Sequence, residues 1–170
     1  DKLKLSCPEA SEQDLIQMHQ LALTIVLTSQ GIPFLHAGTE FLRTKKGVEN
    51  SFKSPDSINA IDWSLKTKNA TTFEKVKQLI ALRKAHPAFR MTSSDAIKKN
   101  IRFDDKAPAG TIAYTINGAA AGESWKKVMV VLNGTDQQQL FKLPAGKWNK
   151  AYTSGEADLD PGKTVSLNKY

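Results

Sequence analysis

The sequence predicts a chain of two parts, an α/β part over residues 1–90 and an all-β part over residues 91–170. Apolar residues recur at helical spacing in two segments before residue 90, and a short apolar run lies between those segments. After Phe89 the pattern changes to short segments of period two, separated by turn residues. Helices beside a buried strand are typical of α/β folds, whereas closely spaced short strands are typical of a small antiparallel β-sandwich.

The first helix is expected to begin after Ser11 and to end before Gly31. Ser11 is followed three residues later by Asp14, which is the arrangement of an N-cap with an acidic residue at N3. Glycine is favoured just beyond a helix C-terminus. The run from Ile32 to Gly38 that follows is too short for a helix, and it favours a strand buried on both faces, as in a parallel sheet.

Residues 44–59 show no periodicity and are rich in Gly, Asn, Ser, Lys, Pro and Asp. Loops of this length are usually functional or disordered. The buried-type side chains that end the segment, up to Trp63, indicate a loop that is fixed to the protein. A second helix is expected from Thr71 or Thr72 to about Ala85, because His86-Pro87 then stops the pattern.

The all-β part is predicted to contain six short strands, with apolar side chains such as Val130 and Leu132 closing one core. The expected strands are Ile101–Phe103, Thr111–Ile116, Lys127–Asn133, Gln139–Leu143, Trp148–Thr153 and Thr164–Leu167.

The α/β part is expected to be incomplete. A parallel strand needs a neighbouring strand on each side and helices over its faces. Residues 1–90 offer a single candidate strand and two long helices. We therefore expect most of the sheet to lie before Asp1, in a longer protein from which this chain is a piece.

Composition argues against several classes of protein. The 170 residues carry a net charge of +7, but the basic residues are spread evenly and form no concentrated footprint for nucleic acid. The longest apolar run is far shorter than a membrane-spanning helix. Cys7 is alone, so it forms no disulfide within the chain. The three histidines share no spacing typical of a metal site, and no cofactor is predicted.

Several motifs resemble those of a known family, the α-amylase superfamily or glycoside hydrolase family 13. Residues 30–45, with Gly31, Pro33, Gly38 and Glu40, resemble the end of that family's catalytic (β/α)8 barrel. Residues 46–63 narrow the resemblance to type I pullulanases and their glycogen-debranching relatives, through the pattern N-S-x-x-x-x-D-S-x-N-x-x-D-W. Segments 79–90, 128–134 and 143–148 are similar to the last barrel helix and the C-terminal β-sandwich.

This resemblance implies a fold and a chemistry. Residues 1–90 would be the terminal part of a (β/α)8 barrel, and residues 91–170 would be a β-sandwich. The missing N-terminal portion of the barrel would be a partner of this chain. The parent enzyme would cleave α-1,6-glucosidic linkages of pullulan or branched glucans by a retaining mechanism, which uses two carboxylates about 5–5.5 Å apart. In the family these lie on earlier strands, and the H-D-N motif that carries a third aspartate is absent here. No catalytic residue is therefore expected in this chain, which alone should be inactive.

Two other functions remain open at this point. The chain could come from an α-amylase or isoamylase that acts on other linkages. It could instead be a non-catalytic glucan-binding module, in which residues before the β-part serve as a scaffold. An aromatic row on one face of the β-part would favour the binding module, and Trp125 and Trp148 do not supply such a row.

Three residues of the long loop are candidates for contact with sugar hydroxyls: Asp56, Asn50 and Asn59. Planar polar side chains bind sugar hydroxyls, and the resemblance implies that this loop borders the cleft. The competing interpretation is a network of turns, because Asx side chains readily bond to their own backbone.

Two further residues are candidates for the floor of the active site. Glu40 would orient this floor or accept hydrogen bonds from the loop backbone, and both roles remain open. Trp63 could stack on a sugar ring, but the sequence favours a core anchor. His36 lies within an apolar run, which favours a buried histidine over a ligand.

Overall fold

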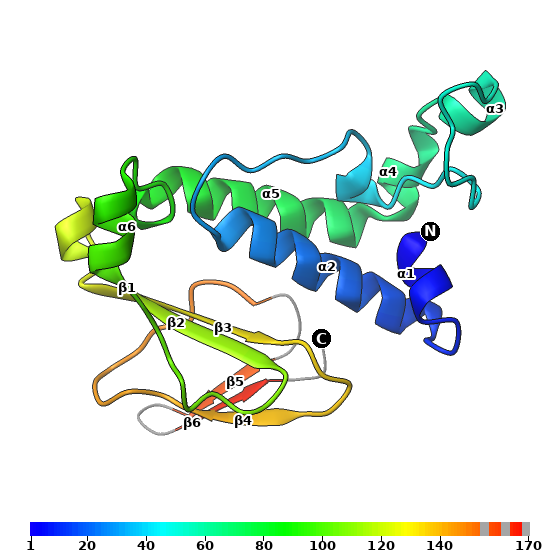
Figure 1. Ribbon diagram of the computed structural model, residues 1–170. Coiled ribbons are helices and arrows are strands. Elements are labelled where there is room, and N and C mark those ends of the chain that lie inside the picture. Colours follow the sequence, from blue (N-terminus) through cyan, green and yellow to red (C-terminus); the bar gives the residue numbers. More distant parts are fainter. Residues whose placement is uncertain (154–156, 161–163, 168–170) are drawn as a thin grey trace.

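The structure is a computed structural model that describes residues 1–153, 157–160 and 164–167. Figure 1 shows a layer of helices above strands that come from the second half of the chain. The α-helices are α1 (Lys2–Ser6), α2 (Glu12–Thr28), α3 (Asp56–Asn59), α4 (Ser64–Lys68), α5 (Ala70–Ala85) and α6 (Ser94–Asn100). The 3-10 helices are η1 (Thr39–Phe41), η2 (Pro87–Phe89) and η3 (Ala119–Ala121). The strands are β1 (Ile101–Phe103), β2 (Thr111–Asn117), β3 (Lys127–Asn133), β4 (Gln139–Lys142), β5 (Ala157–Asp160) and β6 (Thr164–Leu167).

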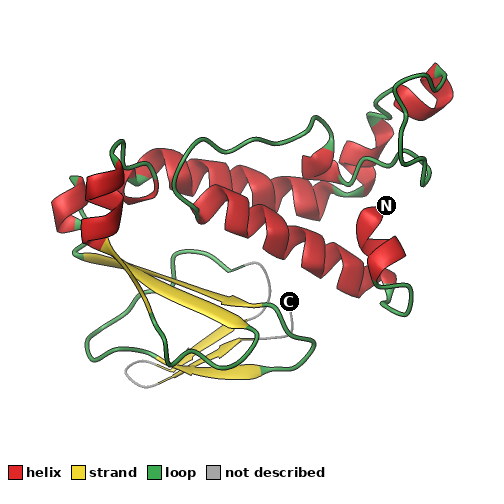
Figure 2. Ribbon diagram, in the orientation of Figure 1, coloured by secondary structure: helices red, strands yellow, loops and turns green. Residues whose placement is uncertain are grey.

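The two long helices form where the sequence predicts them. The hydroxyl of Ser11 accepts a hydrogen bond from the backbone N–H of Asp14, at 3.1 Å, and so caps α2. Helix α5 ends at Ala85, before Pro87. The helices lie side by side (Figure 2) and share a core. That core consists of Leu23, Leu27, Val76 and Leu79.

The strands form two antiparallel sheets of three strands each, in the orders β1-β2-β3 and β4-β6-β5. Register is continuous along β2 and β3, from the pair Thr111 and Asn133 to the pair Asn117 and Lys127. The expected strand at Trp148–Thr153 is wrong, and β5 lies further along the chain. The Tyr152 side chain packs against the helical core instead, which holds this segment against the helices rather than in a sheet.

The expected parallel strand at Ile32–Gly38 is also wrong for this chain, since the segment is an irregular loop. No strand among the described residues is parallel to another, so the segment has no strand to pair with. The side chain of Ile32 is 98% exposed instead of buried. A barrel is therefore not evident in the chain, and the described fold is helical in its first part with antiparallel sheets in its second.

The first sheet shares its core with the helical part, contrary to the expectation that the β-part closes a core of its own. The side chain of Leu140 on β4 is exposed. The hydroxyl of Tyr114 donates to the carbonyl oxygen of Thr28 at the end of α2, at 3.1 Å. The two parts thus pack as one unit. The buried residues of this core are Ala88, Phe89, Tyr114, Ile116, Val128, Val130 and Leu132.

Candidate functional site

The long loop and α3 form a lobe, residues 44–62, that projects beyond the ends of α2 and α5 (Figure 1). The N-terminal residue fixes its first residues. The carboxylate of Asp1 accepts hydrogen bonds from the Thr44 hydroxyl at 2.7 Å and from the Lys45 backbone N–H at 2.8 Å. The lobe is therefore tied to a segment more than 40 residues away in the sequence, as the expectation of a fixed loop requires.

A β-turn at residues 51–54 forms the central part of the lobe. The backbone N–H of Ser54 donates to the carbonyl oxygen of Ser51 at 3.0 Å. The amide nitrogen of Asn59 donates to the carbonyl oxygens of Ser51 and Ser54, at 2.7 and 2.8 Å. The ammonium group of Lys45 donates to the buried Ser51 hydroxyl at 2.5 Å. Both ends of the turn are thus held by side chains.

Asn59 accordingly braces the loop. Both hydrogens of its amide are used in the turn, so its Oδ1 atom is the group left to accept a hydrogen bond from a sugar. The backbone carbonyl of Asn59 also accepts a hydrogen bond from the guanidinium of Arg43. The contact of Asn59 with a sugar stays a prediction.

Asn50 and Asp56 lie on the exposed surface of the lobe. Asp56 is the first residue of α3. Neither side chain has a hydrogen bond or ion pair to the part of the chain that the structure describes, so both can bind an external group. Their role in binding sugar stays a prediction.

Glu40 accepts a hydrogen bond within the loop that joins the lobe to the helices. Its Oε2 atom accepts from the backbone N–H of Gly38 at 3.0 Å. Gly38 has a φ of +90°, and a Cβ atom there would lie 2.6 Å from the Cβ of Arg43, so only glycine fits. The geometry supports a bracing role for Glu40. Its role in the floor of the active site stays a prediction.

Trp63 lies at the base of the lobe, with its ring centroid 5.6 Å from that of the buried Phe41. It remains 65% exposed, so the expected core anchor is wrong in this chain, because no described residue covers its other face. His36, expected in the core, is exposed for a related reason, since its segment pairs with no strand.

A metal site is not evident in the described residues, because no group of three or more His, Cys, Asp or Glu side chains comes together there. His19 has a structural contact instead. Its Nε2 atom lies 2.8 Å from the carbonyl oxygen of Thr39. Burial lowers the pKa of His19, which favours the neutral ring as donor to that carbonyl. Nor is any helix of the described chain long and apolar enough to cross a membrane.

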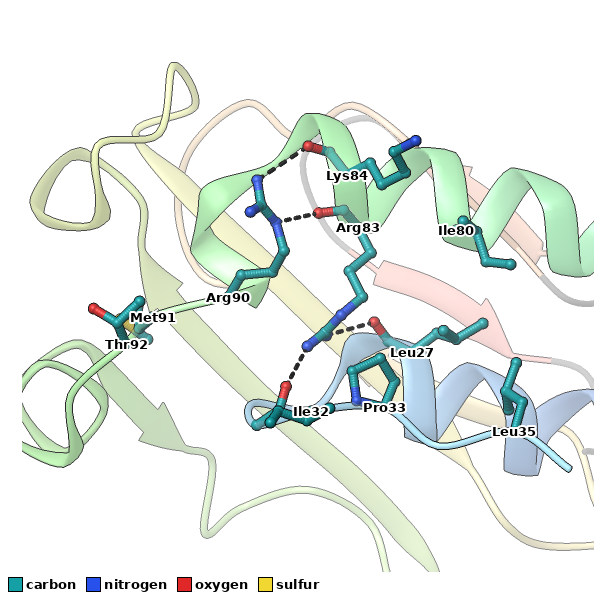
Figure 3. Close-up of a pocket in the computed structure, with 11 residues that line it drawn as sticks. Leu27, Ile32, Pro33, Leu35, Ile80, Arg83, Lys84, Arg90, Met91 and Thr92 are labelled. Carbon is teal, nitrogen blue, oxygen red and sulfur yellow. Dashed lines mark hydrogen bonds between the residues drawn. The ribbon is translucent and has the colours of Figure 1, made fainter.

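An apolar groove of about 760 Å³ lies between the end of α2, the segment after Gly31 and the last turns of α5, at the opposite end of these helices from the lobe (Figure 3). Its walls include Leu27, Ile32, Leu35 and Ile80, and no Asp or Glu side chain lines it. These apolar walls suit packing against another apolar surface.

Sequence reasoning missed the bracing roles of Asp1 and Lys45 and the exposure of Phe52. The two bracing contacts join residues through the fold, and a Ser- and Lys-rich loop gives no periodic signal for them. Phe52 is a large aromatic residue in a mainly polar loop, and this feature of the sequence could have pointed to its exposed position.

Comparison with known proteins gives consistent matches over both parts of the chain. Residues 97–155 match the family model of the pullulanase all-beta domain. The pullulanase of Bacillus subtilis is 35% identical over 144 residues, which are 85% of this chain and 20% of that protein. An isoamylase of Pseudomonas amyloderamosa is 31% identical over 131 residues, covering 70% of this chain and 17% of the relative.

The solved structures that this chain matches are also pullulanases. A pullulanase from Paenibacillus barengoltzii without ligand matches 95% of this chain and 25% of its own, with 42% identity and a TM-score of 0.89. A pullulanase from an Anoxybacillus species, complexed with maltotetraose, matches 99% of this chain and 24% of its own, with 36% identity and a TM-score of 0.89. The chain thus spans about a sixth to a quarter of the length of these relatives.

The relatives are pullulanases and isoamylases, which are glycoside hydrolases that debranch α-glucans. The sequence and the fold of this chain each match a portion of such an enzyme. Within that class, the resemblance to the C-terminal part of type I pullulanases is confirmed.

Proposed function

We propose that the protein containing this chain hydrolyses α-1,6-glucosidic linkages of pullulan and related branched glucans with retention of configuration. The observation that carries the proposal is the continuous match to solved pullulanases. At 42% identity, one alignment covers 95% of the chain and so spans helices, lobe and sheets together. A glucan-binding module alone would account for the second part and leave the match of the first part unexplained.

In this proposal residues 1–90 form the terminal part of a (β/α)8 barrel, and residues 91–170 form a C-terminal β-sandwich. Two features support the first assignment. The exposed Ile32 and Phe34 lie on a segment that lacks a pairing strand, and the apolar groove beside it lacks a covering element. Soluble proteins seldom leave such surfaces uncovered. Neighbouring barrel strands would cover both.

In this proposal the chain contacts the substrate and does not carry the catalytic groups. The family's H-D-N motif is absent from its sequence. Asp56, Asn50 and the Oδ1 atom of Asn59 would bind sugar hydroxyls from the braced lobe. Glu40 and Trp63 would support the floor beneath it. The two catalytic carboxylates of the retaining mechanism would come from sequence outside this chain.

The proposal predicts a sharp difference between the chain and the complete protein that contains it. The complete protein releases reducing ends from pullulan, whereas the purified 170-residue chain releases none above a buffer control, because it lacks the catalytic carboxylates. A reducing-sugar assay at equal molar concentration checks both. Release by the chain alone would overturn the placement of the catalytic groups.

Replacing Asp56 by alanine in the complete protein is expected to raise KM for pullulan with little change in kcat. A hydrogen bond made equally in the ground and transition states acts in this way. A contact with a charged group corresponds to a loss of about 10- to 150-fold in kcat/KM. The matched control is Asp105→Ala, which removes an exposed carboxylate from the β1–β2 connection and should leave both constants unchanged. Unchanged kinetics of Asp56→Ala would argue against any role in binding.

An isoamylase-type activity is the second candidate, because the isoamylase of Pseudomonas amyloderamosa is 31% identical over 131 residues. Substrate preference separates the candidates. The complete protein should hydrolyse pullulan at least as readily as amylopectin if it is a pullulanase. Hydrolysis of amylopectin with pullulan left intact would favour the isoamylase.

A further inference from the structure

The turn at the centre of the lobe presents an aromatic side chain to the outside. Its two central positions are occupied by Phe52 and Lys53, although Gly, Pro, Asn, Asp and Ser dominate such positions. The ring of Phe52 is 76% exposed. The ammonium group of Lys53 lies 5.4 Å from the ring centroid.

The backbone beneath this ring is held in place through the two serines that flank Phe52 and Lys53. Asn59 binds the carbonyl oxygens of Ser51 and Ser54, and Lys45 binds the hydroxyl of Ser51. A fixed backbone lowers the entropy that is lost when a ring orders against a ligand. The hydrogen bonds of Asn59 and Lys45 therefore hold the backbone of Phe52 in one conformation before a partner binds.

The flat apolar face of a glucose ring fits this surface. Aromatic rings bind through large apolar area at low conformational cost. The ammonium group of Lys53, which lies over one face of the ring, adds a donor for sugar hydroxyls. Asp56, four residues along the chain, adds an exposed carboxylate to the same lobe. An aromatic face beside polar groups is the combination that a sugar requires, whereas a purely apolar partner would leave both charged groups without a role.

We propose that Phe52 is a stacking platform for a glucose unit of the α-glucan substrate. This inference rests on the proposed function, and it adds a specificity-determining residue to the polar candidates of the loop. The alternative occupant is another part of the complete protein, packed over the ring.

Four variants of the complete protein test the platform. Phe52→Ala and Phe52→Leu should raise KM for pullulan by about 3- to 10-fold with kcat nearly unchanged, because both remove the aromatic face. Phe52→Tyr should restore KM. Phe103→Ala is the matched control, since Phe103 is also a largely exposed phenylalanine, at 65%, but lies on β1, and its loss should leave KM unchanged.

Two results would overturn the inference. A Phe52→Leu variant with the KM of the original protein would show that an aromatic face is not needed. A Phe52→Ala variant with a lowered Tm and an unchanged KM would show that the ring packs against protein. Calorimetric titration with maltohexaose, which has only α-1,4 linkages, separates this inference from the proposed function. Weaker binding in Phe52→Ala supports the platform even where pullulan is not cleaved, and equal binding contradicts it.

Discussion

Replacing Arg83 by alanine is expected to lower the free energy of unfolding of the chain by roughly 2–4 kcal/mol. The buried guanidinium of Arg83 donates to the carbonyl oxygens of Leu27 at 2.9 Å (Figure 3) and Gly31 at 2.6 Å. It also donates to the carbonyl oxygen of Ser29 at 2.7 Å. The last carbonyls of a helix have no partner within it, so a fixed cation there stabilises the end of α2 and the turn that follows. Urea unfolding followed by circular dichroism measures the loss.

Arg83→Lys and Lys84→Ala complete this experiment. Lysine keeps the charge but lacks the planar fork that reaches several carbonyls at once, so an intermediate loss is expected. Lys84 is an exposed neighbour on the same helix, and its removal should change stability by less than about 0.5 kcal/mol. Equal stability of Arg83→Ala and Lys84→Ala would show that the hydrogen bonds of Arg83 to the end of α2 do not stabilise the chain.

Replacing Glu123 by glutamine is expected to destabilise the chain by roughly 1.5–3 kcal/mol at pH 7. The buried Oε1 atom of Glu123 lies 3.0 Å from Nδ1 of His86, and it accepts hydrogen bonds from the backbone N–H groups of Ser124 and Trp125, at 2.7 and 3.2 Å. The His86 ring stacks on that of Trp125, with centroids 3.6 Å apart. The cluster joins the end of α5 to the β2–β3 connection.

The effect should depend on pH in a defined direction. Burial opposes ionisation of Glu123, but His86 and the hydrogen bonds of Ser124 and Trp125 outweigh it and lower the pKa from 4.5 to about 2. A carboxyl whose pKa is lower in the folded state stabilises it above the unfolded value and loses this effect as pH falls. The difference between the original chain and Glu123→Gln should therefore shrink between pH 4.5 and 2.

Denaturant unfolding at a series of pH values checks this prediction. Glu74→Gln is the control, because Glu74 forms an exposed ion pair with Lys77 on α5, and its removal should have little effect at any pH. A stability difference for Glu123→Gln that stays constant from pH 7 to pH 3 would mean that the charge of Glu123 is not its source.

The sequence predicts the elements whose signal is local. The Ser11 cap and the helical spacing that follows define α2, and alternation defines β2 and β3, because each pattern depends on neighbours in the chain. The segments 32–38 and 148–153 were predicted wrongly. A strand needs a partner, and their partners are set by the fold: the first has no strand beside it, and Tyr152 holds the second against the helices.

The candidate site was predictable in its location and less so in its contacts. Composition and the resemblance point to the loop of residues 44–59, but the type of a side chain does not tell whether it faces backbone or solvent. The amide of Asn59 faces the turn, whereas Asp56 and Asn50 face outward. Trp63 differs from its expected burial because its second face has no cover in this chain.

Proton NMR of pullulan during digestion by the complete protein distinguishes cleavage of α-1,6 linkages from cleavage of α-1,4 linkages. The anomeric signal of the α-1,6 linkages should disappear while that of the α-1,4 linkages persists. The new reducing ends should first appear in the α configuration, as a retaining mechanism requires. Loss of the α-1,4 signal with the α-1,6 signal intact, or reducing ends that first appear as β, would rule out the proposed hydrolysis.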